Sequence, residues 1–387
     1  MSEWWECLLG DITEPIKSTY IPNKEDDYVY LGLEHIEQES LRLVGTGSSK
    51  DVSSQKFIFQ KDDVLLGKLR VYFRKVIQPK FSGVCSTDIW VLRAKENVNQ
   101  TFLFYFIANW DFINTADVGE GGTRMPRADW NFLKTTQWFL PPLPEQKAIA
   151  EVLSSLDDKI DLLHRQNKTL EAMAEALFRQ WFVEEADEGW EIGTICQLVS
   201  IQNGYAFKSS DFRENGTNGV IKIKNISGGI INIENTDFIE DSVIENVDRR
   251  FKIESGDILI AMTGAEIGKL GIIPSTIKSL WLNQRVGLLK EKFKGAKYLA
   301  YLQLKSEYGQ DYIANTATGS AQPNISSTGI EDCEFPALNN LFIKNCALQI
   351  DELYTKVIFN LGQISTLEKL RDNLLPKLIS GEVRVET

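Results

Sequence analysis

The sequence predicts an α/β or α+β protein with two similar globular units, two long helices and an internal pseudo-twofold repeat. One observation is that residues 143–182 and 340–379 carry the same helical pattern, 197 positions apart. In both copies apolar residues recur at alternating steps of three and four, which is the spacing of a coiled-coil seam. Each helix also follows a globular segment of about 140–155 residues. We therefore expect a duplicated chain whose two helices pair antiparallel as a coiled coil.

The chain is expected to divide into four segments. These are a first globular domain, a first helical spacer, a second globular domain and a second helical spacer, at residues 1–142, 143–186, 187–338 and 339–387. Pro144 and Glu145 are typical of a helix start, because proline has no N–H to leave unpaired and an acid favours the N-terminal end of the helix dipole. Strands are predicted at 28–33, 64–69, 89–93, 220–224 and 257–261.

Two polar residues interrupt the apolar seam. Asn167 and Asn360 stand where apolar side chains are expected, and a buried asparagine can determine the register of a coiled coil. We predict this role for both. Pro376 is expected to kink the second helix or end it early. The alternative arrangement is that each helix packs only on its own domain.

Composition excludes several classes of function. The two histidines, His35 and His164, are too few for a histidine-rich metal site, and the five scattered cysteines contain no CxxC pair. We expect reduced thiols, no secretory signal, no membrane span and a cytoplasmic location.

Charge is distributed unevenly along the chain. The net charge of −12 taken alone speaks against a nucleic-acid binder. However, residues 269–297 carry seven basic residues against one acid, and residues 61–80 carry six against two. Eleven acids concentrate in 145–188. Basic globular units joined by acidic helices fit phosphate contact by the domains. The alternative is ordinary solvated surface charge.

No catalytic motif is complete. Gly264 to Lys269 resembles a phosphate-binding P-loop, but it has three residues between its glycines where four are needed, and Leu270 stands where a Ser or Thr should be. Neither histidine belongs to a recognisable triad. We therefore expect no catalytic residue, no metal site and no cofactor in this chain.

Polar loops at matching places in the two units suit contact with DNA. Arg can read guanine edges, and Asn or Gln can read adenine. The expected base-reading residues are Arg124, Arg127, Asn283, Gln284, Arg285, Gln322 and Asn324. The expected phosphate contacts are Lys68, Arg70, Arg74 and Lys269. The alternative is that these are variable surface loops without a ligand.

The motifs at the helices resemble a known family. Residues 143–150 (LPEQKAIA), 176–183 (ALFRQWFV) and 374–385 (LLPKLISGEVRV) resemble the conserved regions of type I restriction–modification specificity subunits. The segments 203–207 (NGYAF) and 318–326 (TGSAQPNIS) resemble their target-recognition domains. The match covers essentially the whole chain, although residues 123–127 (TRMPR) depart from the family's Gly-Ser-x-x-Pro-Asn loop.

This resemblance implies a non-catalytic subunit with several partners. Each globular unit would recognise one half of a split sequence in double-stranded DNA, and the paired helices would set the gap. Two methyltransferase subunits would dock on the helices, and restriction subunits would join the complex. S-adenosylmethionine, ATP and Mg²⁺ would be bound by those partners. Two other functions stay open: a coiled-coil scaffold that binds proteins, and a nucleotide-using enzyme built on Gly264 to Lys269.

Overall fold

The computed structural model describes residues 4–118, 126–186, 189–319, 323–337 and 340–385. The chain forms two compact units. Unit 1 comprises residues 1–159 and 367–387, and unit 2 comprises residues 160–366. Each unit therefore contains one globular segment together with parts of both long helices, so the helices do not form a separate compact unit.

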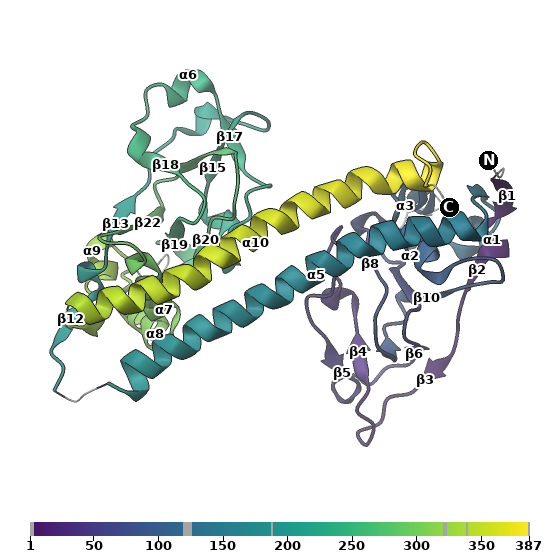
Figure 1. The fold of residues 1–387 in the computed structure, drawn as a ribbon, viewed down its shortest axis with the longest axis horizontal. Coiled ribbons are helices and arrows are strands. Elements are labelled where there is room, and N and C mark those ends of the chain that lie inside the picture. Colours follow the sequence, from purple (N-terminus) through teal and green to yellow (C-terminus); the bar gives the residue numbers. More distant parts are fainter. Residues whose placement is uncertain (1–3, 119–125, 187–188, 320–322, 338–339, 386–387) are drawn as a thin grey trace. The chain divides into compact units, whose positions relative to one another are not determined.

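Unit 1 contains two sheets and a separate strand pair (Figure 1). The pair is β1 (Trp5–Leu8) with β11 (Gln137–Leu140). The first sheet has the order β2 (Thr13–Pro15), β10 (Ile89–Ala94), β7 (Val64–Gly67), β8 (Val76–Ile77). The second has the order β3 (Thr19–Tyr20), β6 (Lys56–Phe59), β9 (Gly83–Cys85), β4 (Val29–Leu31), β5 (Gly47–Ser48). The helices of its globular segment are α1 (Leu9–Ile12), α2 (Gln100–Ala108), α3 (Trp110–Val118) and α4 (Trp130–Leu133).

Unit 2 repeats this plan. Its strand pair is β12 (Ile192–Thr194) with β23 (Glu334–Pro336). One sheet has the order β13 (Val199–Asn203), β22 (Val286–Glu291), β19 (Ile258–Ala261), β20 (Leu270–Ile272), β16 (Gly229–Ile230). The other has the order β14 (Phe212–Arg213), β17 (Asp237–Ile239), β15 (Asn218–Ile221), β21 (Ser279–Leu282), β18 (Lys252–Ile253). The helices of its globular segment are α6 (Asp241–Ile244), α7 (Ala296–Lys305), α8 (Glu307–Thr316) and α9 (Ser327–Glu331).

The strand pairings confirm the predicted duplication. The antiparallel run β2-β10-β7-β8 corresponds to β13-β22-β19-β20. The one parallel contact of unit 1's sheets, β4 with β9, corresponds to the parallel contact of β15 with β21. The antiparallel neighbour β6 of β9 corresponds to β18 beside β21. Both units are therefore mixed α/β units that share these strand pairings, and unit 2 has in addition β16, which pairs parallel with β20.

Most predicted strands are found, and one is shorter than expected. β4, β7, β10 and β19 lie inside or within one residue of their predicted ranges. The run 220–224 was predicted as strand throughout, but β15 ends at Ile221 and residues 223–225 form a 3₁₀ turn. The side chain of Asn225 accepts a hydrogen bond from the backbone N–H of Lys222 at 2.9 Å. This local bond replaces strand pairing, as short polar side chains commonly do.

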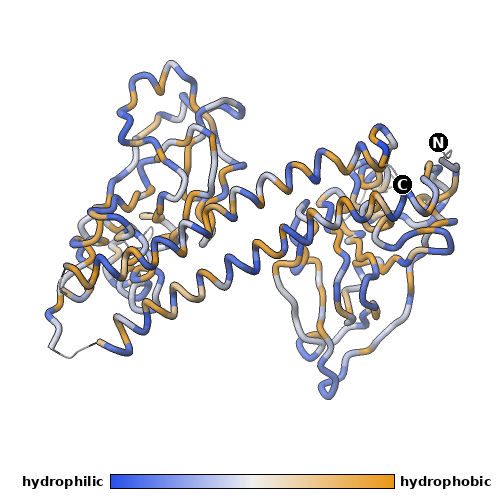
Figure 2. The backbone as a smooth tube through the Cα atoms, in the orientation of Figure 1, coloured by the Kyte–Doolittle hydropathy of each residue, from blue (hydrophilic) through white to orange (hydrophobic). Residues whose placement is uncertain are grey.

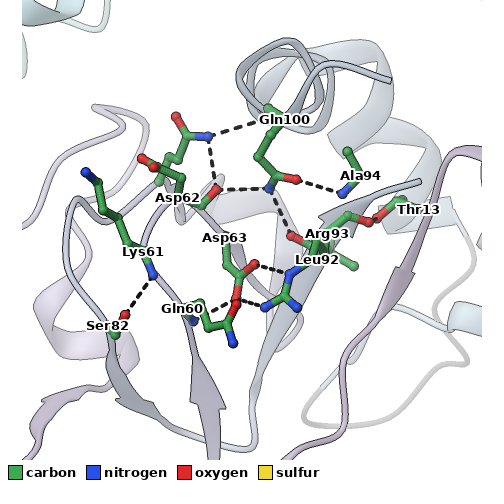
Figure 3. A network of polar contacts seen from close by, with 11 residues as sticks. Thr13, Gln60, Lys61, Asp62, Asp63, Ser82, Leu92, Arg93, Ala94 and Gln100 are labelled. Atoms are coloured by element: carbon green, nitrogen blue, oxygen red, sulfur yellow. Dashed lines mark hydrogen bonds and ion pairs between the residues drawn. The ribbon is translucent and has the colours of Figure 1, made fainter. Parts of the chain in front are cut away.

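A polar network in unit 1 anchors the start of β7 (Figure 3). The buried carboxylate of Asp63 accepts hydrogen bonds of 2.8 and 2.9 Å from the guanidinium of Arg93, and one of 2.8 Å from the backbone N–H of Gln60. Gln100 donates to the carbonyl of Asp62 at 3.0 Å. Asp257 in unit 2 accepts the matching bond from the backbone N–H of Glu254 at 2.8 Å. The strand that leads into the site described below is therefore held at its beginning in both units.

Two long helices complete both units: α5 (Leu143–Arg179) and α10 (Asn340–Ser380). A stripe of buried side chains follows the predicted seam, and apolar positions recur along both helices (Figure 2). The beginning of α5 and the end of α10 belong to the core of unit 1, and the remaining parts belong to the core of unit 2. The helices thus pack on the domains as well as on each other.

Pro376 does not end α10 early. The helix continues to Ser380, and Leu375, Leu378 and Ile379 on either side of the proline are buried in the core of unit 1. Burial of these apolar side chains outweighs the hydrogen bond that proline removes. Of the two expected effects of Pro376, a kink or an early end, the early end is not found, because local preference alone does not account for this burial.

In unit 2 the two seam asparagines meet. The side-chain amide of Asn360 donates to Oδ1 of Asn167 at 2.8 Å, and Nδ2 of Asn167 lies 3.5 Å from the carbonyl oxygen of Val357. Both side chains are buried. This contact joins α5 to α10 within unit 2. The role in register that was predicted for them stays a prediction.

In unit 1 the helices are joined by charge instead. Arg371 of α10 is buried and donates to Asp157 of α5 at 2.9 Å, and Asp157 also accepts from the hydroxyl of Tyr105 at 2.6 Å. Burial alone would lower the pKa of Arg371, but Asp157 and the neighbouring Asp372 raise it above its usual value. Arg371 therefore keeps its positive charge although it is buried.

Arg74 belongs to the same buried region. Its guanidinium is 2% exposed, donates to the carbonyls of Ala108 and Glu39 at 2.6 and 3.0 Å, and stacks over the ring of Trp110. A side chain enclosed in this way cannot reach a phosphate. The phosphate contact predicted for Arg74 was wrong, because the sequence shows its charge but not its burial.

Replacing either seam asparagine alone is expected to destabilise unit 2. N167L or N360L leaves the other amide buried without its partner, at a cost of about 1–3 kcal/mol. The double variant N167L/N360L should cost less than the sum of the two. Hydrogen exchange of residues 350–366 in a urea series measures these three free energies. Strictly additive costs would show that the two side chains are not coupled.

Arg74→Ala is expected to destabilise unit 1 without altering the salt dependence of DNA binding. Two backbone carbonyls lose charge-assisted hydrogen bonds, which is worth about 2–3 kcal/mol in total. Urea unfolding measures the stability, and a titration of duplex DNA at several salt concentrations measures the binding. The exposed Lys80→Ala serves as control for stability. A normal unfolding curve combined with a weaker salt dependence would overturn this assignment.

Candidate nucleic-acid interface

Three chain segments meet beyond the end of β7 in unit 1, and we call them loop junction 1: residues 68–70, 86–88 and 126–128. The backbone N–H of Arg70 donates to the carbonyl of Pro126 at 3.0 Å, and that of Ala128 donates to the carbonyl of Lys68, also at 3.0 Å. The backbone N–H of Lys68 donates to the carbonyl of Asp88 at 2.9 Å. Backbone pairing thus fixes the three segments to one another.

Unit 2 builds the same arrangement from residues 262–264, 283–285 and 323–325, which we call loop junction 2. Gly264 donates to the carbonyl of Pro323 at 2.9 Å, Ile325 to that of Met262 at 3.0 Å, and Met262 to that of Arg285 at 3.1 Å. These bonds match those of loop junction 1 one by one. Segment 86–88 therefore corresponds to 283–285, and Pro126-Arg127 corresponds to Pro323-Asn324.

An ion pair holds the first base-reading candidate. Nε of Arg127 lies 3.1 Å from Oδ1 of Asp88, and the Arg127 side chain is 48% exposed. No other hydrogen bond of this guanidinium is present within the described residues. Arg124 lies outside the described residues. Asp88 was not predicted; an acid facing an arginine across a sheet edge is visible only in the fold.

Lys68 and Arg70 stand beside this pair. Burial lowers the pKa of Lys68; the carboxylate of Asp88 opposes that shift, while the positive charges of Arg127 and Lys17 add to it. Arg70 is exposed and adopts a left-handed backbone with φ of 51°. Two of the three predicted phosphate contacts of unit 1 thus lie together, and Lys17 is a further member. The sequence did not point to Lys17, because only strand pairing brings residue 17 close to Lys68.

Loop junction 2 presents mainly uncharged polar side chains. Gln284, Arg285 and Asn324 are exposed, and Asn283 is half-buried. Gln322 lies outside the described residues. Lys269 is exposed but pairs with Glu266. The predicted reading residues of unit 2 that the structure describes are therefore at the surface and close to one another.

A fourth segment closes loop junction 2. Residue 205 bridges residue 283, and the hydroxyl of Ser327 donates to Oδ1 of Asn203 at 2.8 Å. A Cβ on Gly204 would lie 2.1 Å from the carbonyl oxygen of Asn283, so only glycine permits this close approach. The glycine of the motif at residues 203–207 is therefore required by the close approach of the two backbone segments.

The described residues do not form a nucleotide site or a cluster of metal ligands. Gly264 to Glu266 forms a single 3₁₀ turn followed by strand β20, not the loop and helix of a nucleotide site. Burial raises the pKa of Cys85 and Cys333 to about 12, and of Cys7 and Cys346 to about 11, so these thiols are protonated at neutral pH. Within the described residues no three His, Cys, Asp or Glu side chains group as metal ligands do. No described helix is long and apolar enough to cross a membrane.

The sequence is similar to that of known proteins along most of its length. Residues 1–172 and 187–368 match the model of the type I restriction modification DNA specificity domain. The chain is 26% identical to the specificity subunit of the type I restriction enzyme MjaVIII of Methanocaldococcus jannaschii, over 99% of this chain and 94% of that protein. It is 22% identical to the specificity subunit of the type I restriction enzyme HindI of Haemophilus influenzae, over 99% and 100% of the two chains.

The fold agrees with a solved structure. The crystal structure of the type I restriction–modification S subunit from M. genitalium superposes with a TM-score of 0.61 and 16% identity, covering 97% of this chain and 96% of that one. The chain has two copies of one mixed unit and two matching loop junctions, and two of its segments match the same family model. The chain belongs to the family of type I restriction–modification DNA specificity subunits.

Proposed function

We propose that this chain recognises a bipartite target in double-stranded DNA, with one half-site read by each unit. The observation that carries the proposal is the pair of loop junctions. They have the same backbone hydrogen bonds but different side chains at equivalent places: Arg127 against Asn324, and Asp88 against Arg285. A shared scaffold with unlike polar side chains is what reading two different short sequences requires.

The exposed side chains have the chemistry of base readers. The Arg127 side chain is 48% exposed, and the two parallel donors of a guanidinium fit the O6 and N7 acceptors of guanine. Asn324 offers one donor and one acceptor, which fit adenine. Lys68, Arg70 and Lys269 are better suited to phosphates, which position a protein on DNA without reading its sequence.

We propose further that α5 and α10 form an antiparallel coiled coil that sets the gap between the half-sites. The buried 3-4 stripe and the two polar contacts, Asp157 with Arg371 and Asn167 with Asn360, support this idea. A polar pair inside an apolar seam disfavours other registers, because a slip would bury its members without partners.

Partner subunits would supply the chemistry. Two methyltransferase subunits that bind S-adenosylmethionine would dock on the helical region, and restriction subunits that use ATP and Mg²⁺ would join them. A pocket of about 960 Å³ in unit 2 supports docking of a protein, since Phe178, Phe182, Val183 and Ile192 line it. The same pocket favours the second candidate function, a scaffold that binds proteins only.

Salt dependence separates these two functions. A DNA-recognising chain should lose affinity for duplex DNA by orders of magnitude between about 50 and 200 mM salt, because counterions are released on binding. A scaffold that binds only proteins would not bind the duplex at any of these concentrations.

Arg127→Ala is expected to relax or abolish recognition of one half-site and leave the other intact. Loss of a bidentate arginine contact removes about 1–3 kcal/mol of discrimination at one base pair. Methylome sequencing of cells that carry the variant with its partner subunits reads both half-sites at once. Asn324→Ala is the matched control and should affect the opposite half. Equal weakening of both half-sites by either variant would contradict one unit per half-site.

Inserting one heptad into each helix, after Leu163 in α5 and after Gln363 in α10, is expected to lengthen the tolerated gap. A heptad adds roughly 10 Å at 1.5 Å per residue and preserves the seam. Methylome sequencing again reports the spacing. The same insertion in only one helix is the control and should abolish methylation. Methylation at the original spacing by the double insertion would exclude a spacer role.

A further inference from the structure

The two loop junctions carry unequal charge. Strand pairing places Pro15 opposite Leu92 and Ile201 opposite Leu289, so Lys17 corresponds to Asn203. The backbone bonds described above match Lys68 with Met262 and Arg70 with Gly264. Three cations of loop junction 1 therefore correspond to three uncharged residues at the equivalent places of loop junction 2.

The backbone of Arg70 adopts a conformation that arginine disfavours. Its φ of 51° lies in the left-handed region, and the equivalent Gly264 has φ of 80°. Nothing lies within 4 Å of a Cβ built on Gly264, so space does not demand glycine there; the backbone conformation favours it. No hydrogen bond or ion pair of the Arg70 side chain occurs within the described residues. Strain kept without an internal contact points to a role outside the chain.

The cations of loop junction 1 share one carboxylate. Asp88 pairs with Nε of Arg127 and also acts on the charge of Lys68, so a single carboxylate stands against the four cations Lys17, Lys68, Arg70 and Arg127. Burial lowers the pKa of Lys68; the carboxylate of Asp88 opposes this shift, and the positive charges of Arg127 and Lys17 add to it. An external anion at this place would relieve the repulsion between these cations and the desolvation of Lys68.

We propose that loop junction 1 is the phosphate anchor of the protein, with Lys17, Lys68 and Arg70 supplying most of the salt-dependent DNA affinity of the two junctions. Loop junction 2 reads its half-site mainly through uncharged side chains and contributes little to that salt dependence. This inference rests on the proposed DNA-recognition function and adds an unequal division of affinity between the units.

The test converts loop junction 1 into its counterpart. In K17N/K68M/R70G each cation is replaced by the residue that unit 2 holds at the same place. Binding of the full-length chain to a fluorescent duplex of arbitrary sequence is titrated across salt concentrations. Each lost phosphate contact lowers the slope of log affinity against log salt by about 0.9, so the triple variant should lose about 2 to 3. Arg285→Ala in loop junction 2 should lose at most about 1.

Two single variants separate charge from fold. R70G should raise the melting temperature by about 2 °C, because glycine adopts the left-handed backbone without strain, and should still weaken DNA binding. R70K keeps the charge and should keep the slope. The variant K50A at the exposed Lys50 removes one positive charge, as R70G does, and should leave the slope unchanged.

The outcomes are distinct. An unchanged slope in the triple variant, or an equal loss in R285A, would overturn the phosphate anchor while DNA recognition stands. A wild-type chain that binds no duplex at the lowest salt would overturn the proposed function itself. A lower melting temperature in R70G would show that the arginine stabilises the fold, which contradicts the role given to it here.

Discussion

The pairing of α5 with α10 is the constraint on which the rest of the structure depends, because both helices contribute side chains to the cores of both units. Within unit 1 the contact is an ion pair between Asp157 and Arg371, supported by the hydroxyl of Tyr105. Within unit 2 it is an amide pair between Asn360 and Asn167. A buried charge or amide without its partner is costly, so both contacts are expected to disfavour a shift of register. The apolar stripe buries the larger surface of the two helices.

The duplication explains how one chain can hold two loop junctions that have the same backbone frame but different side chains. The strand orders, the cap at Asp63 and Asp257, and the bonds that hold the loop junctions are repeated almost bond for bond. The side chains carried on this frame are free to differ, because the frame is maintained by backbone hydrogen bonds and buried apolar residues. Arg70 against Gly264 shows the limit of that freedom: the backbone conformation is kept even where the residue does not favour it.

Sequence reasoning located the loops of the site better than it located the individual residues. The loops were found because matching segments recur in both halves in the same order. Arg74 was misplaced because a charge pattern does not show that a guanidinium is enclosed by Glu39, Ala108 and Trp110. Lys17 was missed because it reaches the site only through strand pairing with residues far away in the chain. The pairing of Asp88 with Arg127 was not predicted, because it joins residues far apart in the chain.

The amino-acid sequence by itself determined the repeat, the two long helices and the polar interruptions of their seam. These are periodic features, and a periodic pattern of apolar residues specifies which face of a helix is buried whatever lies opposite. Only the tertiary structure decided that α10 continues past Pro376, that Arg74 is internal, and that Asp88 holds Arg127. Each of these outcomes depends on a contact between residues distant in sequence, and the free energy of such a contact outweighs the local preference from which the prediction was made.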